Sequence, residues 1–216
     1  MKRPGGRSAR VRDAVRQATL AELALHGFQG LTVENVAQRS GVHKTTVYRR
    51  WGSAEGLVAD ALDLAGEEPW PVPDTGTLAG DLRELADMVR TGVQDDSLVH
   101  SFVAAAFQNG AAAEALHRFY QARHEQSAEV VRRAVDRGEL GAEVDAEELV
   151  RLAIGPLFYR IFISREPITE REAERVADAA LAAARAGILD RAPAEVRTEP
   201  AGPGSEAGPA SAFGAR

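Results

Sequence analysis

The sequence contains no cysteine, which excludes disulfide bonds, thiolate metal sites and cysteine nucleophiles. It has no apolar run near the length that a membrane-spanning helix needs, so no membrane partner is expected. The basic N-terminal segment MKRPGGRSAR lacks the apolar stretch of a signal peptide. With 216 residues the chain can form one large domain or two small ones around a real core. Together these features favour a cytoplasmic protein.

Sequence signatures of catalysis are also missing. The chain has no nucleophile elbow, no glycine-rich phosphate-binding loop and no His–Glu metal spacing. His117 and His124 are seven residues apart on one helical face, but no set of carboxylates accompanies them, so surface histidines are the simpler interpretation. The sequence therefore predicts no enzyme, no metal site and no cofactor.

The net charge of −6 does not by itself indicate a nucleic-acid partner, but the distribution of charge does. Residues 1–52 contain ten Lys/Arg and three acids, a charge of +7, so the remainder of the chain carries −13. Such asymmetry indicates that one end of the chain meets a polyanion. A solvated basic face would explain the charge, but not its coincidence with the motif at residues 32–51.

Apolar residues recur at helical spacing nearly everywhere and at strand spacing nowhere, which predicts an all-α protein. The expected helices are 9–26, 33–39, 43–50, one that follows Ser53, 78–95, 98–108, 111–137, 146–165 and 170–187. The expected N-terminal caps are Thr32, Ser53, Thr77 and Ser97, with capping boxes at Asp145–Glu148 and Thr169–Glu172.

Composition divides the chain into five parts. The segment GEEPWPVPDTG holds three prolines and interrupts the helical pattern, so it is expected to connect two domains. Within it, Trp70 is expected to cap the core rather than contact a ligand. The C-terminal segment is rich in Pro, Gly, Ala and Ser, which predicts disorder. The predicted parts are a basic flexible arm (1–8), a helix-turn-helix domain with a linking helix (9–65), a connection (66–76), a regulatory and dimerisation domain (77–190) and a disordered tail (191–216).

Residues 32–51, TVENVAQRSGVHKTTVYRRW, predict a helix-turn-helix. Ala37 is small where two helices must cross, and Gly41 stands where the chain turns with positive φ. Val47 would then place an apolar side chain of the second helix on the first. The residues between Gly41 and Trp51 are mostly hydrogen-bond donors or cations, which suits the major groove of DNA. Similar units also occur in ordinary helical bundles, so the motif alone does not establish DNA binding. The positive charge of the same region favours the DNA-binding interpretation.

Residues 9–65 resemble the N-terminal domain of the tetracycline-repressor (TetR) family of bacterial transcription regulators. The resemblance rests on a first helix ending in HGFQGLTVENVAQRSGV, then HKTTVYRRW, then SAEGLVADAL. The later segments PDTGTLAGDL and GPLFYRIFISREPIT are similar to one C-terminal subtype of the family. The resemblance implies an all-α homodimer with a DNA-binding head, a linking fourth helix and a body that binds a small effector. One departure is Ala54, where many members place a phosphate-binding lysine.

The recognition helix is expected to supply the DNA contacts. Its first residues are candidates for base edges, and its two arginines for phosphate. Tyr48 resembles the family tyrosine that hydrogen-bonds phosphate, although simple packing is an alternative, and Trp51 is expected to anchor the core. The segment 2–12 either follows the DNA or only solubilises the chain. The predicted DNA-binding residues are Thr32, His43, Lys44, Thr45, Thr46, Tyr48, Arg49 and Arg50.

A dimer interface is predicted from the helix at 146–165, which is apolar on more than one face and must be covered on both sides. Gly155-Pro156 should kink this helix. Small residues of the following helix would allow close approach of a second subunit by two-fold symmetry. The predicted interface residues are Leu152, Pro156, Tyr159, Ile163, Ala177, Ala180 and Ala184.

An effector pocket is predicted in the helical body, with plain hydrophobic core as the alternative for each residue. The candidates are Phe102, Phe107, Leu116, Phe119 and Tyr120. Few charged residues are expected inside the body, which favours an apolar or aromatic ligand. The sequence thus predicts a homodimeric repressor that a small molecule releases from a palindromic operator. The alternatives are an effector-independent architectural protein and an activator of the same fold.

Overall fold

The computed structural model describes residues 6–67, 69–94 and 96–191, and this part of the chain is helical without a named strand. The predicted all-α fold is confirmed. None of the described helices is long and apolar enough to cross a membrane. The predicted arm and tail lie outside the described residues, except for 6–8 and 191. The helices are α1 (Arg7–Gly30), α2 (Val33–Ser40), α3 (Lys44–Trp51), α4 (Ala54–Glu67), α5 (Leu78–Gln94), α6 (Ser97–Gln108), α7 (Gly110–Ser127), α8 (Glu129–Asp136), α9 (Ala146–Phe158), the π-helix Tyr159–Ser164 and α10 (Glu170–Arg185).

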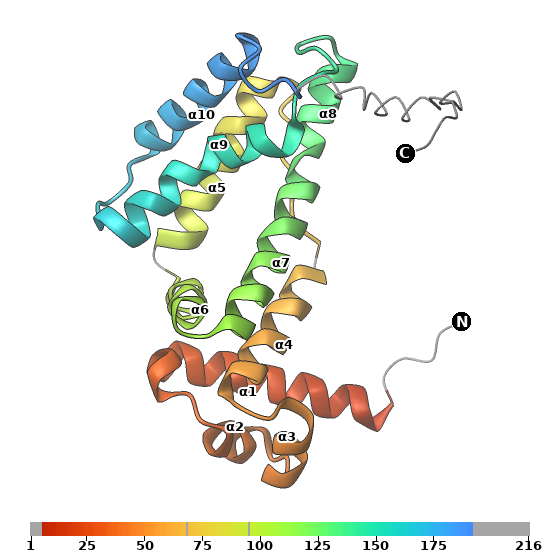
Figure 1. The fold of residues 1–216 in the computed structure, drawn as a ribbon, viewed down its shortest axis with the longest axis vertical. Helices are drawn as coiled ribbons and strands as arrows, with labels where there is room; N and C mark the ends of the chain where they lie inside the picture. The colour runs from red at the N-terminus through yellow and green to blue at the C-terminus, as the bar shows by residue number, and fades with distance from the viewer. Residues whose placement is uncertain (1–5, 68, 95, 192–216) are drawn as a thin grey trace, which may run out of the picture.

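Helices α1, α2 and α3 form a head at one end of the molecule, and α5, α9 and α10 form a layer of the body at the other (Figure 1). Short-range sequence signals determine the structure of the head. The Thr32 hydroxyl accepts a hydrogen bond from the Asn35 N–H and caps α2, and Gly41 turns the chain with φ of 69°. Gly27 interrupts the regular geometry of α1 with φ of 64°. The predicted cap and turn of the helix-turn-helix are therefore confirmed.

The body differs from prediction at three places. The expected helix at 111–137 is two helices, α7 and α8, which meet at Ala128 (φ −59°, ψ −13°), and no proline or glycine marks the break. The expected helix at 146–165 ends at Phe158 and continues as a π-helix beyond Pro156. Asp96 caps α6, not Ser97, because its carboxylate accepts from two N–H groups of the first turn.

The two predicted capping boxes have different outcomes. Thr169 and Glu172 form the complete box at the start of α10, with each side chain bonded to the other residue's backbone. Asp145 caps α9, but the side chain of Glu148 contacts Arg151 instead of returning to the cap. A favourable nearby cation therefore replaces the second half of the box.

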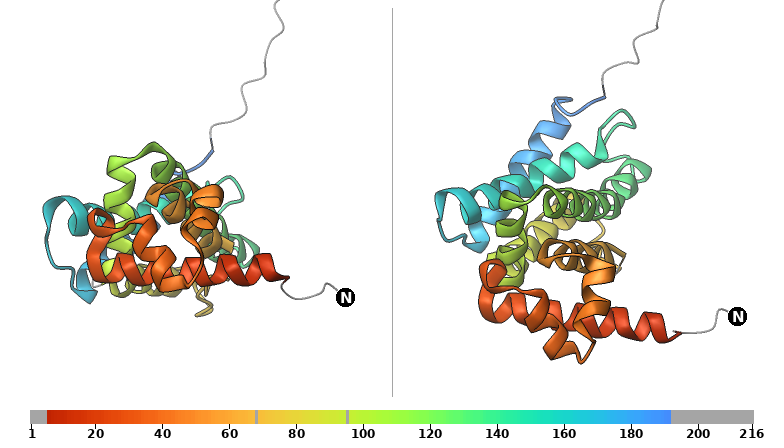
Figure 2. Two further views of the ribbon diagram at one scale, coloured as in Figure 1. Left: turned by 90° about the horizontal axis from the view of Figure 1, so that it is seen from below. Right: turned by 60° about the horizontal axis from the view of Figure 1, so that its bottom comes forward.

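Two hydrophobic clusters hold the fold together. One joins the head with α4, α6 and α7, and the other joins α5, α8, α9 and α10. Helices α4 and α7 run side by side between the two ends (Figures 1 and 2). Since α6 and α7 contribute to the head cluster, packing continues across the proline-rich connection.

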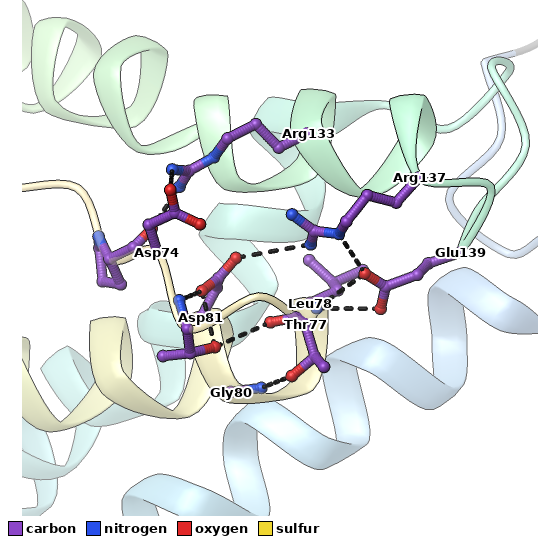
Figure 3. A network of polar contacts seen from close by, with 10 residues as sticks. Asp74, Thr77, Leu78, Gly80, Asp81, Arg133, Arg137 and Glu139 are labelled. Atoms are coloured by element: carbon purple, nitrogen blue, oxygen red, sulfur yellow. Dashed lines mark hydrogen bonds and ion pairs between the residues drawn. The ribbon is translucent and has the colours of Figure 1, made fainter.

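A buried carboxylate fixes that connection to the body (Figure 3). Asp81 of α5 is fully buried, and its Oδ1 accepts hydrogen bonds from the Thr75 N–H at 2.6 Å and the Thr75 hydroxyl at 2.8 Å. Its Oδ2 has no hydrogen bond among the described residues, but the Arg137 guanidinium lies 3.7 Å away. Glu139 accepts the Leu78 N–H at 2.9 Å, and this bond lowers the pKa of Glu139. The network therefore orders the start of α5.

We predict that Asp81→Ala lowers the free energy of unfolding by about 2–4 kcal/mol, because it removes the buried carboxylate that accepts hydrogen bonds from the N–H and the hydroxyl of Thr75. Guanidinium denaturation at one protein concentration measures this. Asp136→Ala removes an exposed carboxylate of α8 and is the matched control, with an expected change within about 0.5 kcal/mol. Equal stability of the two variants would contradict the structural role of Asp81.

Candidate nucleic-acid interface and internal pocket

Helix α3 presents one buried and one exposed face. Val47 is fully buried and Trp51 is 9% exposed, so these two side chains hold α3 against the head cluster. Trp51 is thus the core anchor that the sequence predicts. Helix α3 lies at the end of the molecule away from the body (Figures 1 and 2), and its exposed residues are polar or charged. Thr46 is half-buried, and the exposed residues of the predicted set are Thr32, His43, Lys44, Thr45, Tyr48, Arg49 and Arg50.

Two residues of this surface, Tyr48 and Arg50, are held by neighbours. The Tyr48 hydroxyl donates to Glu34 Oε1 at 3.0 Å, and this bond raises the pKa of Tyr48. Arg50 donates to the carbonyl and the hydroxyl of Ser8 at 3.3 and 3.2 Å, and its guanidinium lies 5.0 Å from the Trp51 ring. Tyr48 must therefore leave Glu34 if its hydroxyl is to donate to a phosphate, and Arg50 joins α3 to the start of α1.

A hollow between α1 and α3 adds two residues of the segment 2–12 that the predicted set of DNA-binding residues lacks. Ser8 and Val11 line it together with Thr46, Arg49 and Arg50. The two arginines give the hollow a positive charge, which suits a phosphate group. The position of Ser8 beside Arg50 depends on how α1 crosses α3, so the sequence carries no local signal for it.

The start of α4 lacks the lysine of the family pattern, and one of its backbone N–H groups is already hydrogen-bonded to the capping residue. The Ser53 hydroxyl accepts the Gly56 N–H at 3.3 Å, which confirms Ser53 as the cap. Glu55 follows Ala54, and a hydrogen bond with Ser53 lowers the pKa of Glu55. An alanine therefore stands where a cation would meet phosphate, with a carboxylate beside it, so α4 offers a weaker phosphate contact than a lysine would.

The body contains a cavity of about 230 Å³ between α5, α6, α7 and α9. Phe119 and Tyr120 line it, as expected for a pocket. Three other predicted residues lie elsewhere: Phe102 is buried in the head cluster, Leu116 packs against that cluster, and Phe107 is 77% exposed. The prediction that these three residues line the pocket is therefore corrected. Helices α6 and α7 contribute side chains both to the head cluster and to the cavity wall, and helical periodicity does not distinguish the two. The lining is Trp70, Leu85, Met88, Val89, Gly92, Val93, Asp96, Val99, Phe119, Tyr120, Arg123, His124, Ser127, Ile154 and Phe158.

The cavity is bordered by an arginine, an aspartate and two titratable groups that are neutral, Tyr120 and His124. The Arg123 guanidinium lies 4.9 Å from the Trp70 ring and 5.0 Å from the Phe119 ring, and it donates to the Ala65 carbonyl at 2.7 Å. Burial raises the pKa of Tyr120 to about 12. Burial and the charge of Arg151 lower the pKa of His124, which is therefore not the surface histidine that the sequence suggested. Both groups are uncharged at neutral pH.

The exposed apolar residues of the body gather on α9 and the π-helix. Leu152, Tyr159 and Ile163 are 38%, 60% and 59% exposed, and Leu152 and Pro156 line a groove against α10. Ala177 and Ala184 belong to the buried face of α10 that packs within the protomer, so their prediction as interface residues is corrected. Ala180 is buried too, but it lines the groove together with Leu152 and Pro156. Small residues occur on both faces of α10, and spacing alone does not show which face is covered. The exposed ones are Ala179 and Ala182.

Comparison with known proteins assigns both halves of the chain to one protein family. Residues 15–61 match the family model of bacterial regulatory proteins of the tetR family, and residues 72–180 match the tetracyclin repressor-like C-terminal domain. An uncharacterised HTH-type transcriptional regulator of Mycobacterium bovis is 33% identical, over 74% of this chain and 80% of its own. A DNA-binding transcriptional repressor, TetR, of Mycobacteroides abscessus is 29% identical, over 69% of this chain and 84% of its own.

Among solved structures, the crystal structure of a TetR-family transcription regulator superposes with a TM-score of 0.62 at 32% identity. The match covers 80% of this chain and 97% of that one. These relatives are transcription regulators and not enzymes by description.

Proposed function

The chain belongs to the TetR family of bacterial transcriptional regulators, and from this we propose that it is a homodimeric repressor that a small effector releases from a palindromic operator. The repressor named among its relatives supports the sign of regulation. The observation that carries the proposal is the exposed polar face of α3, backed by a fully buried Val47. A short helix fixed from behind can enter the major groove without losing its packing.

On this surface the residues have different roles. Lys44, Thr45 and Thr46, at the start of α3, reach base edges, with His43 beside them. Tyr48, Arg49 and the N–H and hydroxyl of Thr32 contact phosphate, and Arg50 does so from its position against Ser8. Phosphate contacts give affinity and register, whereas base contacts give sequence preference.

The dimer forms through the exposed apolar face of α9 and the π-helix, with the outer face of α10 completing a four-helix interface. Leu152, Pro156, Tyr159 and Ile163 form this face, which we call the α9 face. An apolar surface of this kind is expected to be covered in solution. Two-fold symmetry then presents two α3 helices to the two halves of a palindrome.

Release by an effector requires a connection from the cavity to the head, and α4 provides it. Arg123 contacts two rings of the cavity and the carbonyl of Ala65 in the last turn of α4. On the same helix, Asp60 pairs with Arg12 of α1 at 2.8 Å. A ligand that displaces Trp70 or Phe119 would thus shift the contacts of α4 and change the spacing of the two heads.

We predict that Arg49→Ala weakens binding to every duplex and makes binding less dependent on salt. Each lost phosphate contact removes about 0.9 from the slope of log K against log salt, so a dimer loses about 2. Fluorescence anisotropy from low to moderate salt measures the slope on a preferred and a random duplex. Arg132→Ala, an exposed arginine of α8 paired with Glu129, is the control and should leave the slope unchanged. An unchanged slope for Arg49→Ala would remove this residue from the DNA surface.

The repressor proposal is tested in the host by mapping where the protein binds the chromosome and comparing transcripts with a strain that lacks the gene. Transcripts beside bound sites should rise in the deletion strain. A fall at these sites would indicate an activator. Binding spread without preference, with no change in neighbouring transcripts, would favour the architectural alternative.

A further inference from the structure

The indole of Trp70 gives the cavity of the body a neutral donor without a partner among the described residues. Trp70 lines the cavity, and its indole Nε1 is buried with no acceptor within hydrogen-bond distance. Buried N–H groups in folded proteins are nearly always paired, because an unpaired donor loses its hydration without compensation. An acceptor atom on a molecule in the cavity would satisfy this donor.

The charged groups of the cavity are already engaged, so they do not call for a charged ligand. Arg123 donates to the Ala65 carbonyl and to Gln126 Oε1, and it lies over the rings of Trp70 and Phe119. The Asp96 carboxylate accepts two N–H groups at the start of α6. A charged ligand would lose its hydration on entering the cavity. The two charged side chains there are of opposite sign and already hydrogen-bonded, so they would not compensate for that loss.

The remaining walls are flat or polarizable. The Tyr120 ring meets the rings of Phe119 and Phe158 edge-on, with centroids 5.2 and 5.3 Å apart. With Trp70 these rings border the cavity, and Met88 adds a thioether. The volume of about 230 Å³ exceeds the roughly 150 Å³ of a cavity known to hold benzene. One substituted ring or two fused rings therefore fit.

We infer that this cavity binds a neutral, planar aromatic molecule of one or two rings, with a carbonyl-type oxygen that accepts the Trp70 indole N–H. Trp70 thereby selects for the polar substituent, and the rings of α7 and α9 select for the flat body. The inference rests on the proposed function only in taking the bound molecule as the effector that releases DNA.

Calorimetric titration of the full chain without DNA tests the inference with three probes of similar shape. They are 2-acetylnaphthalene, the hydrocarbon 2-isopropenylnaphthalene and the anion 2-naphthoate. The ketone should bind about tenfold more tightly than the hydrocarbon, because only its oxygen accepts the indole N–H. The anion should bind most weakly.

Replacement of the donor gives the second comparison. Trp70→Phe should weaken the ketone about tenfold, to the affinity of the hydrocarbon, and change the hydrocarbon less than about twofold. Trp51→Phe, at the other tryptophan of the chain, is the control and should change neither affinity. If circular dichroism shows that Trp70→Phe does not fold, the comparison of the three probes on the natural chain still tests the inference.

Several results would overturn the inference. Equal binding of ketone and hydrocarbon would show that the indole N–H recognises nothing on the ligand, and tightest binding of 2-naphthoate would indicate an anion site. Absence of binding by all three probes would refute an aromatic pocket. By contrast, the predicted binding pattern without any change in DNA affinity would leave the ligand class intact and refute release by that ligand.

Discussion

Leu152→Glu should dissociate the dimer and reduce affinity for a palindromic operator by about 100- to 10,000-fold. Leu152 is 38% exposed on the α9 face and borders the groove against α10, so in the proposed dimer a glutamate there would bring two like charges into the interface. A separated protomer binds only one half-site and loses the gain that comes from linking two binding events. Sedimentation measures the assembly, and anisotropy measures the affinity.

The matched control for this substitution is Leu25→Glu. Leu25 is 63% exposed on α1 and belongs to neither the α9 face nor the polar face of α3. This variant should remain a dimer and bind the operator within a few-fold of the natural chain. A dimeric Leu152→Glu protein with normal operator affinity would show that a different surface joins the subunits.

Thr46→Ala should change which sequences the protein prefers. Thr46 lies in the first turn of α3 and lines the hollow between α1 and α3, where its hydroxyl and methyl can both meet a base edge. The loss of one good base contact costs about 1–3 kcal/mol per half-site, and therefore about 2–6 kcal/mol for a palindrome. Binding to random duplexes, which depends on phosphate contacts, should be nearly unchanged.

A comparison of the preferred duplex with a random duplex measures this change in preference. Thr91→Ala is the matched control, because Thr91 is exposed on α5 and bonds only to the carbonyls of the preceding turn. It should leave both affinities unchanged. If Thr46→Ala weakens both duplexes equally, Thr46 contacts the backbone of DNA and does not read sequence.

The head was predictable from sequence because its structure depends on signals close along the chain. Thr32 caps α2 three residues from its partner, Gly41 makes the turn, and Val47 is placed by helical spacing alone. Each of these signals is a short-range geometric requirement that few residue types meet. The break at Ala128 has no such signal, because alanine has the highest helix propensity and predicts that the helix continues.

The pocket was predictable only in part because it depends on contacts between distant segments. Phe119 and Phe102 are both aromatic residues of amphipathic helices, yet one borders the cavity and the other belongs to the head cluster. Trp70 borders the cavity because the proline-rich connection returns to α7, where Arg123 lies over its ring. The alanines of α10 show the same limit, since Ala177 is buried and Ala179 is exposed.

Selection of bound sequences from a random DNA pool, with the full chain at near-physiological salt, tests the proposed activity most directly. A dimer with two α3 helices should recover a palindrome whose half-sites lie about one turn of DNA apart or somewhat more. Recovery of no preferred sequence would contradict a sequence-specific repressor and would leave the basic head as a general DNA-binding surface.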